Sequence, residues 1–332
     1  MWQRIAPALY LFLLAPFVGE FLLGALPITM LPALVVLAPM YGGGVLLIRE
    51  LARRRRLGWP GIALLGLAYA VLEEGLVTRS LFDTGYAGGG LLDYGWIPGL
   101  GIGSWWTVFV LTLHVAWSVC VPVALAEAAV PARADEPWLD RAGLAVFAVV
   151  FLLGAAAGAT TSAYRPSAAQ LVGTVLVVLA LVVAALLNPR AERTPLPAQA
   201  PGPWPVFWAA FAAGSAFWLA AMAMGVLDDL PAPVVVTGFL ALAAATVVVV
   251  WRWSGRTGWG AWHRFALAAG GLLAYAWHGF AQAPAVPVAD AVKFAGNAVF
   301  ALLAAGLLAR TAARLRRAGV SPVRAGADGT AQ

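Results

Sequence analysis

The chain has 332 residues, of which 62% are apolar and only 11% charged, and its mean hydropathy is +0.85. A water-soluble domain with a charged surface does not reach these values. They exclude a separate soluble catalytic domain and predict an all-α protein embedded in the lipid bilayer. The formal charge of +6 comes from arginines in short loops beside apolar segments, which indicates membrane topology and argues against nucleic-acid binding.

Apolar segments long enough to cross a bilayer follow one another along the chain. About 20 apolar residues of helix span the roughly 30 Å hydrocarbon core. The first segment is too long for a signal peptide and lacks a cleavage site, so we expect it to be retained. We predict a bundle of about ten transmembrane helices, at 5–27, 31–51, 59–81, 104–127, 142–163, 168–188, 204–227, 232–252, 263–283 and 287–310.

The arginines predict the orientation of this bundle. Only Arg79 and Arg165 fall on one side of the ten predicted spans. The other side receives Arg4, Arg49, Arg53 to Arg56, Arg133, Arg141, Arg190, Arg193, Arg252, Arg256, Arg264, Arg310, Arg314, Arg316, Arg317 and Arg324. Because loops rich in Lys and Arg stay in the cytoplasm, we expect a multi-pass plasma-membrane protein with both termini cytoplasmic.

A Pro-rich polar segment divides the predicted spans into six and four. The expected parts are a six-helix membrane part at 1–188, a Pro-rich cytoplasmic linker at 189–203, a four-helix membrane part at 204–312, and a basic, disordered cytoplasmic tail at 313–332. The first part carries Glu20, Glu73, Glu74 and His114, and the second carries His278 and Lys293.

Several polar side chains lie inside the predicted spans. Each charged group at that depth costs roughly 2.5–3.5 kcal/mol, so each requires a partner or a function. At 1.5 Å per residue all of them fall about 8–15 Å below the outer end of their helix. We therefore expect one water-accessible cavity that opens outward. Its residues are Glu20, Glu73, Glu74, His114, His278, Lys293 and Asn297.

The adjacent carboxylates Glu73 and Glu74 point about 100° apart on a helix, so they cannot easily share one cation. One of them is expected to be neutral or bound to a partner. Lys293 is a candidate partner for Glu20 or for one of the pair. Such a carboxyl group can serve as a general acid or base, a proton carrier or a metal ligand.

The motif LEEGLVTRSLFD at 72–83, followed by His114 and His278 on later helices, resembles the CAAX-protease and bacteriocin-processing superfamily of intramembrane proteases and the related PrsW-type proteases. The resemblance implies that Glu73 or Glu74 activates a water molecule while the two histidines bind or polarise the substrate. The matching supporting residues are Arg79, as the basic residue of the first motif, and Gln282, four residues after His278.

Three functions remain open from the residues alone. The first is a glutamate/histidine hydrolase acting on a membrane-embedded peptide or lipidic substrate. In it, a divalent metal such as zinc would be held by Glu73, Glu74, His114 and His278. The second is a proton-coupled transporter or exporter in which these carboxylates and Lys293 form the relay. The third is a non-enzymatic scaffold whose polar layer fixes helix packing, aided by small residues such as Gly154 and Gly158.

Overall fold

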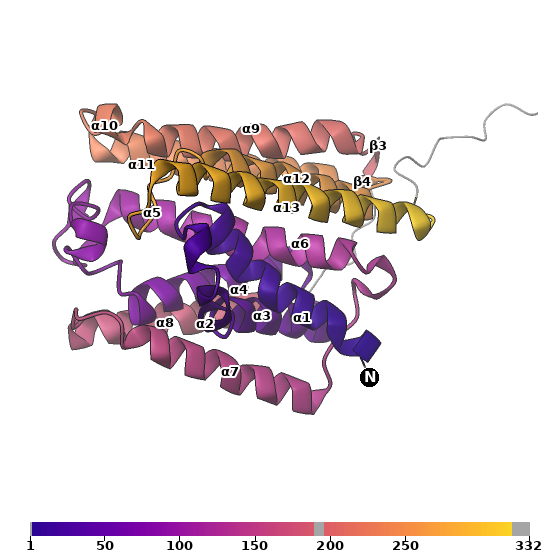
Figure 1. Ribbon diagram of the computed structural model, residues 1–332, viewed down its shortest axis with the longest axis horizontal. Helices are drawn as coiled ribbons and strands as arrows, with labels where there is room; N and C mark the ends of the chain where they lie inside the picture. The colour runs from indigo at the N-terminus through magenta and orange to yellow at the C-terminus, as the bar shows by residue number, and fades with distance from the viewer. Residues whose placement is uncertain (1, 189–195, 321–332) are drawn as a thin grey trace, which may run out of the picture.

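The computed structural model describes residues 2–188 and 196–320, and almost all of their regular structure is helical (Figure 1). The α-helices are α1 (Trp2–Pro16), α2 (Ala33–Leu37), α3 (Tyr41–Arg55), α4 (Gly58–Leu72), α5 (Ser104–Leu113), α6 (Val121–Ala128), α7 (Arg141–Ala159), α8 (Ala168–Leu186), α9 (Pro203–Met222), α10 (Met224–Leu227), α11 (Ala232–Ser254), α12 (Ala261–His278) and α13 (Asp290–Arg317). This confirms the prediction of an all-α transmembrane bundle.

Eight helical segments of the described chain are long and apolar enough to cross a membrane. They are Ile5–Leu22, Gly58–Val77, Ser104–Ala128, Arg141–Ala159, Ala168–Leu186, Pro203–Met222, Ala232–Ser254 and Asp290–Arg317, and each corresponds to one predicted span.

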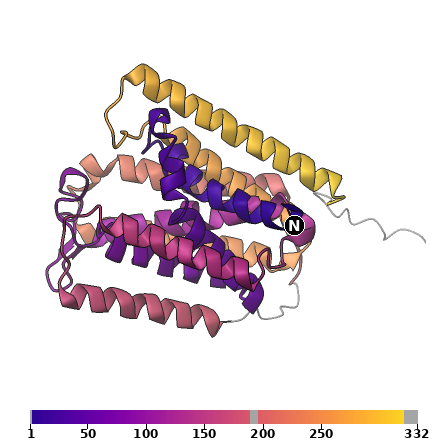
Figure 2. The same ribbon diagram turned by 60° about the horizontal axis from the view of Figure 1, so that its bottom comes forward.

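The two remaining predicted spans differ from the expectation. The segment 31–51 is broken at Pro39, which lies between the short helix α2 and the longer helix α3. The segment 263–283 overlaps α12, which begins at Ala261, ends at His278 and is largely buried. Both α3 and α12 pack inside the bundle, α3 against α1 and α7, and α12 against α9 and α6 (Figures 1 and 2).

Three spans change from α-helical to π-helical hydrogen bonding part of the way along. The π segments are η1 (Phe17–Leu22) after α1, η3 (Glu73–Val77) after α4, and η5 (His114–Cys120) between α5 and α6. A π segment inserts one extra residue into a helix, is rare, and is found frequently at functional sites. Each of these three carries polar residues that the sequence places inside the membrane.

Glycines set the closest helix contacts. A Cβ atom on Gly154 of α7 would lie 2.6 Å from Pro39, and one on Gly158 would lie 2.7 Å from Val77. A Cβ atom on Gly42 of α3 would likewise overlap the Phe12 carbonyl of α1. These backbones approach closely because the glycines have no side chain.

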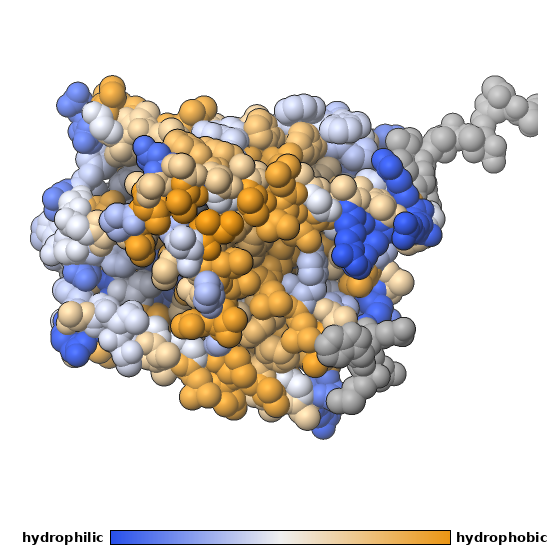
Figure 3. Space-filling view, in the orientation of Figure 1, coloured by the Kyte–Doolittle hydropathy of each residue, from blue (hydrophilic) through white to orange (hydrophobic). Residues whose placement is uncertain are grey.

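The outer face of the bundle is apolar. Figure 3 shows a hydrophobic middle flanked by polar residues at both ends of the molecule. Exposed leucines and valines lie along α7, α8, α11 and α13, including Leu153 at 65% and Leu302 at 73% exposure. In water such a surface would aggregate, whereas in a bilayer it contacts acyl chains.

Connecting segments cover the two ends of the bundle. At one end, residues 79–103 form a loop with the 3-10 turn η4 (Tyr86–Gly88) and a hairpin of β1 (Trp96–Ile97) and β2 (Ile102–Gly103). At the other end, β3 (Leu196–Gln199) pairs with β4 (Arg256–Thr257). Two further 3-10 turns are η2 (Ile28–Met30) and η6 (Pro131–Arg133).

The predicted division into a six-helix and a four-helix part stays a prediction. Helix α12 of the second part packs on α6 of the first. Helix α13 continues to Arg317, past the predicted limit at 312. The centre of the predicted linker, 189–195, and most of the predicted tail, 321–332, lie outside the described residues.

Candidate functional site

The three π-helical segments bring four predicted site residues into one buried cluster. Segment η1 supplies Glu20, η3 supplies Glu73 and Glu74, and η5 supplies His114. Contacts between η1 and η5, and between α4 and η5, hold the segments together.

His114 lies between the two adjacent carboxylates. Its Nε2 atom is 2.6 Å from Glu74 Oε1, and its Nδ1 atom is 3.4 Å from Glu73 Oε2. Ser118, one helical turn further along, is 3.0 Å from the same Nδ1. One ligand atom from each of Glu73, Glu74 and His114 lies within 4.8 Å of the others, and all three side chains are buried. This is the geometry of a potential metal-binding cluster.

The second oxygen of Glu74 is held by hydroxyl groups from its own helix end. Thr78 donates to Glu74 Oε2 over 2.8 Å, and Ser80 donates to the same oxygen. Trp106 in turn donates to the Ser80 hydroxyl over 3.1 Å. Glu74 is therefore fixed in position by two hydroxyl donors and by His114.

A second layer of the cluster contains Glu20 and two tyrosines. The Tyr41 hydroxyl donates to Glu20 Oε1 over 2.5 Å. The rings of Tyr41 and Tyr69 lie 6.2 and 6.3 Å from the His114 ring. The Tyr69 hydroxyl is close to Glu73 but outside hydrogen-bonding geometry, and both it and Glu73 Oε2 are buried without a hydrogen bond.

The cluster holds more acidic groups than basic ones. Glu20, Glu73 and Glu74 face a single imidazole, His114. Among the described residues, none of the three carboxylates forms an ion pair with Lys or Arg. Buried carboxylates without counter-charges are strongly disfavoured, so the cluster needs protons or a bound cation to balance its charge.

The two predicted cationic partners lie elsewhere. Lys293 is half-buried on α13, and its Nζ atom lies 5.1 Å from the ring centre of Phe294. Arg79 has a left-handed backbone conformation, with φ of +63°, and donates to the carbonyls of Ser162 and Tyr164. Arg79 therefore anchors the loop between α7 and α8 and does not support the Glu pair directly.

His278 is not part of the cluster of potential metal ligands in the described chain. It stacks on Trp218 with ring centres 3.7 Å apart, and its Nε2 atom is 3.2 Å from Gln282 Oε1. Asn297 donates to the Gly279 carbonyl over 2.7 Å, which ties α13 to the end of α12. His278, Gln282 and Asn297 thus pack one end of α12, and their part in a shared site remains a prediction.

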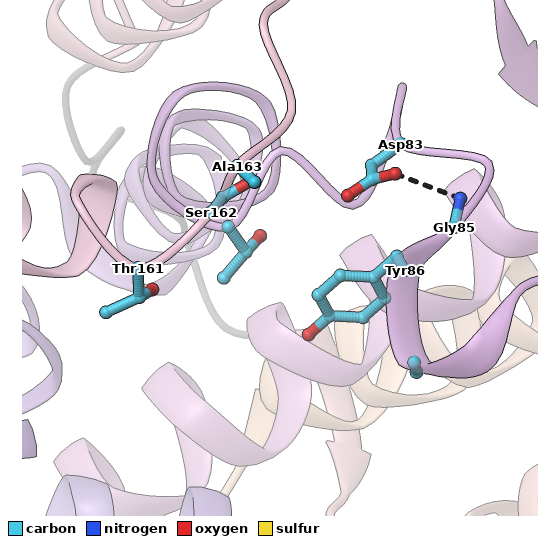
Figure 4. A pocket seen from close by; sticks show the side chains of 8 residues that line it. Asp83, Gly85, Tyr86, Thr161, Ser162 and Ala163 are labelled. Atoms are coloured by element: carbon cyan, nitrogen blue, oxygen red, sulfur yellow. Dashed lines mark hydrogen bonds between the residues drawn. The ribbon is translucent and has the colours of Figure 1, made fainter.

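A polar pocket of about 330 Å³ lies at the end of the bundle next to the cluster (Figure 4). Asp83, Gly85 and Tyr86 line it from one loop, and Thr161, Ser162 and Ala163 line it from another. Thr78, which binds Glu74, is also part of its wall. Burial, reinforced by nearby Glu74, raises the pKa of Tyr86, so this side chain stays a neutral hydrogen-bond donor.

A buried ion-pair network occupies the other end of the bundle. Arg53 binds both oxygens of Glu127, over 2.7 and 2.5 Å, and Arg49 donates to Glu127 over 3.1 Å and to Glu50 over 2.8 Å. Arg49 also lies 3.5 Å above the ring of Trp138.

This network was missed by the sequence analysis, which assigned Arg49 and Arg53 to a cytoplasmic loop. The available signal was Glu50 within the arginine run and Glu127 at the end of an apolar span. Buried charges that are paired in this way act as structural joints between helices.

These features define a multi-pass integral membrane protein with a buried glutamate–histidine cluster. The chain belongs to a family described as an uncharacterized membrane protein family, whose model matches residues 9–317. No curated protein and no solved structure matches it. The family assignment overturns the resemblance to the CAAX-protease and bacteriocin-processing superfamily and to PrsW-type proteases, which rested on short motifs at 72–83, His114 and His278.

Proposed function

We propose that this membrane protein is a metal-dependent hydrolase whose site is formed by Glu73, Glu74 and His114. The observation that carries the proposal is the approach of three potential ligand atoms to within 4.8 Å, in a buried cluster whose carboxylates pair with no Lys or Arg among the described residues. A divalent ion would supply the missing positive charge. This conclusion does not depend on the discarded family resemblance.

The residues fit a zinc ion. Catalytic zinc sites use three His or carboxylate ligands and leave a fourth position for water. Glu73, Glu74 and His114 would each offer one ligand atom to the ion, and these three atoms lie within 4.8 Å of one another. The ion would bind to His114 and Glu74 in place of their present hydrogen bond. When bound, it lowers the pKa of its water to near neutrality and supplies a nucleophile.

The remaining polar groups have roles that follow from their positions. The Tyr69 hydroxyl is buried without a hydrogen bond and is a donor for the developing negative charge on a carbonyl oxygen. The Glu20–Tyr41 pair is a second acidic group that can accept or return a proton. Thr78 and Ser80 keep Glu74 in place during these transfers.

The pocket beside Thr78 is the route by which the substrate reaches the site in this proposal. It opens at the end of the bundle opposite the arginine-rich end, and in this proposal that end faces the outside of the cell, which the arginine distribution supports. The substrate class is a peptide or lipidic ester or amide at the outer surface of the plasma membrane. Both termini are cytoplasmic in this proposal.

Metal content tests the site first. Purified protein in detergent is dialysed against zinc and analysed by elemental mass spectrometry. We expect about one zinc per chain, lost in Glu74→Gln and His114→Ala and retained in the control variants Glu136→Gln and His278→Ala. Zinc retained by Glu74→Gln and His114→Ala, or absent from the wild-type protein, would contradict the proposal.

Hydrolysis is tested without knowledge of the substrate. Membranes that contain the wild-type protein or Glu74→Gln are incubated in water enriched in oxygen-18, and peptides and lipids are analysed by mass spectrometry. We expect products with one heavy oxygen only with the wild-type protein, and their loss on addition of a zinc chelator. Identical products from both membranes would exclude a hydrolase.

A proton-coupled transporter is the second candidate, and the inner ion-pair network favours it. The polar pocket opens at one end while Arg49, Arg53 and Glu127 close the other, as expected for an outward-open state. Proton flux into proteoliposomes separates the two functions. Flux that is abolished by Glu73→Gln, without zinc binding, would favour transport over hydrolysis.

A further inference from the structure

A second cavity, of about 400 Å³, lies at the arginine-rich end of the bundle, between α1, α6 and α13. It is separate from the candidate hydrolase site, which adjoins the pocket at the opposite end. Ala6 and Tyr10 line it from α1, and Ala129 and Val130 line it from the end of α6. Its third wall is α13.

Two arginines line this cavity without an acidic partner. Arg310 and Arg314 of α13 both belong to its wall. Arg314 donates to the Ala129 carbonyl over 3.3 Å, and neither arginine forms an ion pair with a carboxylate in the described part of the chain. The Tyr10 side chain, with Thr311 beside it, adds a hydroxyl to the same wall. Two guanidinium groups beside an apolar cavity favour a ligand with an anionic group and a hydrocarbon part.

The depth of the arginines matches the lipid headgroups. Arg310 follows Asp290, the first residue of α13, by 20 residues, which corresponds to about 30 Å of helix. This length equals the hydrocarbon thickness of a bilayer. Arg310 and Arg314 therefore lie at the level of the phosphates when Asp290 lies at the opposite surface.

The helix face beyond the arginines is suited to an acyl chain. Leu303 and Leu307 precede Arg310 by seven and three residues, so all three share one face of α13. Leu303 is 52% exposed and Leu307 lines the cavity. An amphiphile with its phosphate at the arginines would run its chain along these leucines.

We propose that this cavity binds the headgroup of an anionic phospholipid. The phosphate binds Arg310 and Arg314, the glycerol part contacts Tyr10, and the acyl chain lies on Leu303 and Leu307. Basic cavities between transmembrane helices at the cytoplasmic surface bind such headgroups. This proposal is independent of the proposed hydrolase, because the two sites share no residue.

Native mass spectrometry of the full-length protein tests the proposal. The protein in detergent is titrated with phosphatidylglycerol and, in parallel, with phosphatidylcholine. We compare the wild-type protein with Arg310→Gln/Arg314→Gln and with Arg316→Gln/Arg317→Gln, which removes the same charge from the same helix without altering the cavity wall. We expect one tightly bound phosphatidylglycerol in the wild-type protein and in the control.

The cavity variant should bind phosphatidylglycerol about 25-fold more weakly, because each arginine near the membrane contributes roughly fivefold. Equal weakening in both double variants would indicate diffuse charge attraction and would overturn the proposal. Unchanged binding in the cavity variant would overturn it as well. A third arm adds inorganic phosphate at the same concentration, and equal occupancy by phosphate would show a small-anion site and contradict a lipid occupant.

Discussion

At the scale of single residues, Glu127 is a buried carboxylate whose charge is balanced by two arginines. Its carboxylate accepts hydrogen bonds from both Arg49 and Arg53 and is 2% exposed. Removing one partner of a buried network leaves the other charges without compensation. The opposing arginines are themselves buried.

We therefore predict that Glu127→Ala destabilises the protein by about 3–5 kcal/mol. Unfolding by increasing fractions of dodecyl sulfate in mixed micelles measures the change. Glu136→Ala is the matched control, because Glu136 is exposed and lies 4.0 Å from its partner Arg133. This control should change stability by less than about 1 kcal/mol. Similar losses in both variants would show that the buried network is not a structural joint.

The residue scale also shows how far the sequence could predict the site. Glu20, Glu73, Glu74 and His114 converge in the structure, and their shared depth in the predicted spans was the signal that indicated it. Depth along a helix is only one coordinate, however, and contact also requires the correct rotation about the helix axis. Lys293 satisfies the depth criterion, but it forms no ion pair with these carboxylates in the described part of the chain.

The rotation could not be predicted because of the π segments. Each of them inserts an extra residue, which turns all following side chains by about 100° relative to a regular α-helix. Thr78 and Ser80 follow η3, and both bind Glu74 in this arrangement. No periodicity in an apolar span reveals where such an insertion occurs.

At the scale of helices, the contact between α1 and α3 depends on one glycine. A Cβ atom on Gly42 would overlap the carbonyl of Phe12, which belongs to the backbone of α1 and cannot rotate away. Helix α3 carries Tyr41 at its first position, and α1 leads into the π segment with Glu20. The same contact therefore places both members of the Glu20–Tyr41 hydrogen bond.

We predict that Gly42→Ala separates α1 from α3 and costs about 1–3 kcal/mol, the usual range for overpacking. Dodecyl sulfate unfolding measures the loss, and zinc content reports whether the adjacent site is disturbed. Gly173→Ala in α8 is the control, because nothing lies within 4 Å of a Cβ atom there. If Gly42→Ala is as stable as this control, the close helix approach is not required.

Helices α3 and α12 show why the count of spans was only partly predictable. Hydropathy measures how well a segment dissolves in lipid, but α12 is mostly surrounded by protein and tolerates His263 and Arg264 near its start. The break at Pro39 likewise interrupts a segment that carries no charged residue from 31 to 48. Hydropathy alone identifies eight of the predicted spans. The segments that contain α3 and α12 are positioned by packing against neighbouring helices.

At the scale of the whole molecule, the two ends of the bundle differ in charge and in openness. One end holds most of the arginines, the buried network of Glu127 and the cavity beside Arg314. The other end holds the polar pocket next to Thr78 and the hairpin loop. The proposed functions of both cavities depend on which end faces the cytoplasm.

Cysteine labelling decides that orientation. The native Cys120 is first replaced by alanine, and single cysteines are placed at Gly99 in the hairpin loop, at Glu136 before α7 and at Gly319 after α13. A membrane-impermeant maleimide should label Gly99→Cys in intact cells, because the positive-inside rule places this loop outside. Glu136→Cys and Gly319→Cys should react only after the membrane is permeabilised.

Each site tests a different part of the argument. Gly99 and Glu136 are separated by one span, so the two must react from opposite sides of the membrane. Gly319 lies beyond all later helices, and its side matches that of Glu136 only if α12 crosses the membrane in addition to the five apolar segments that follow Glu136. Labelling of Gly319→Cys in intact cells would therefore reject α12 as a span. Labelling of Glu136→Cys in intact cells would mean that the end of the bundle with the glutamate–histidine cluster faces the cytoplasm.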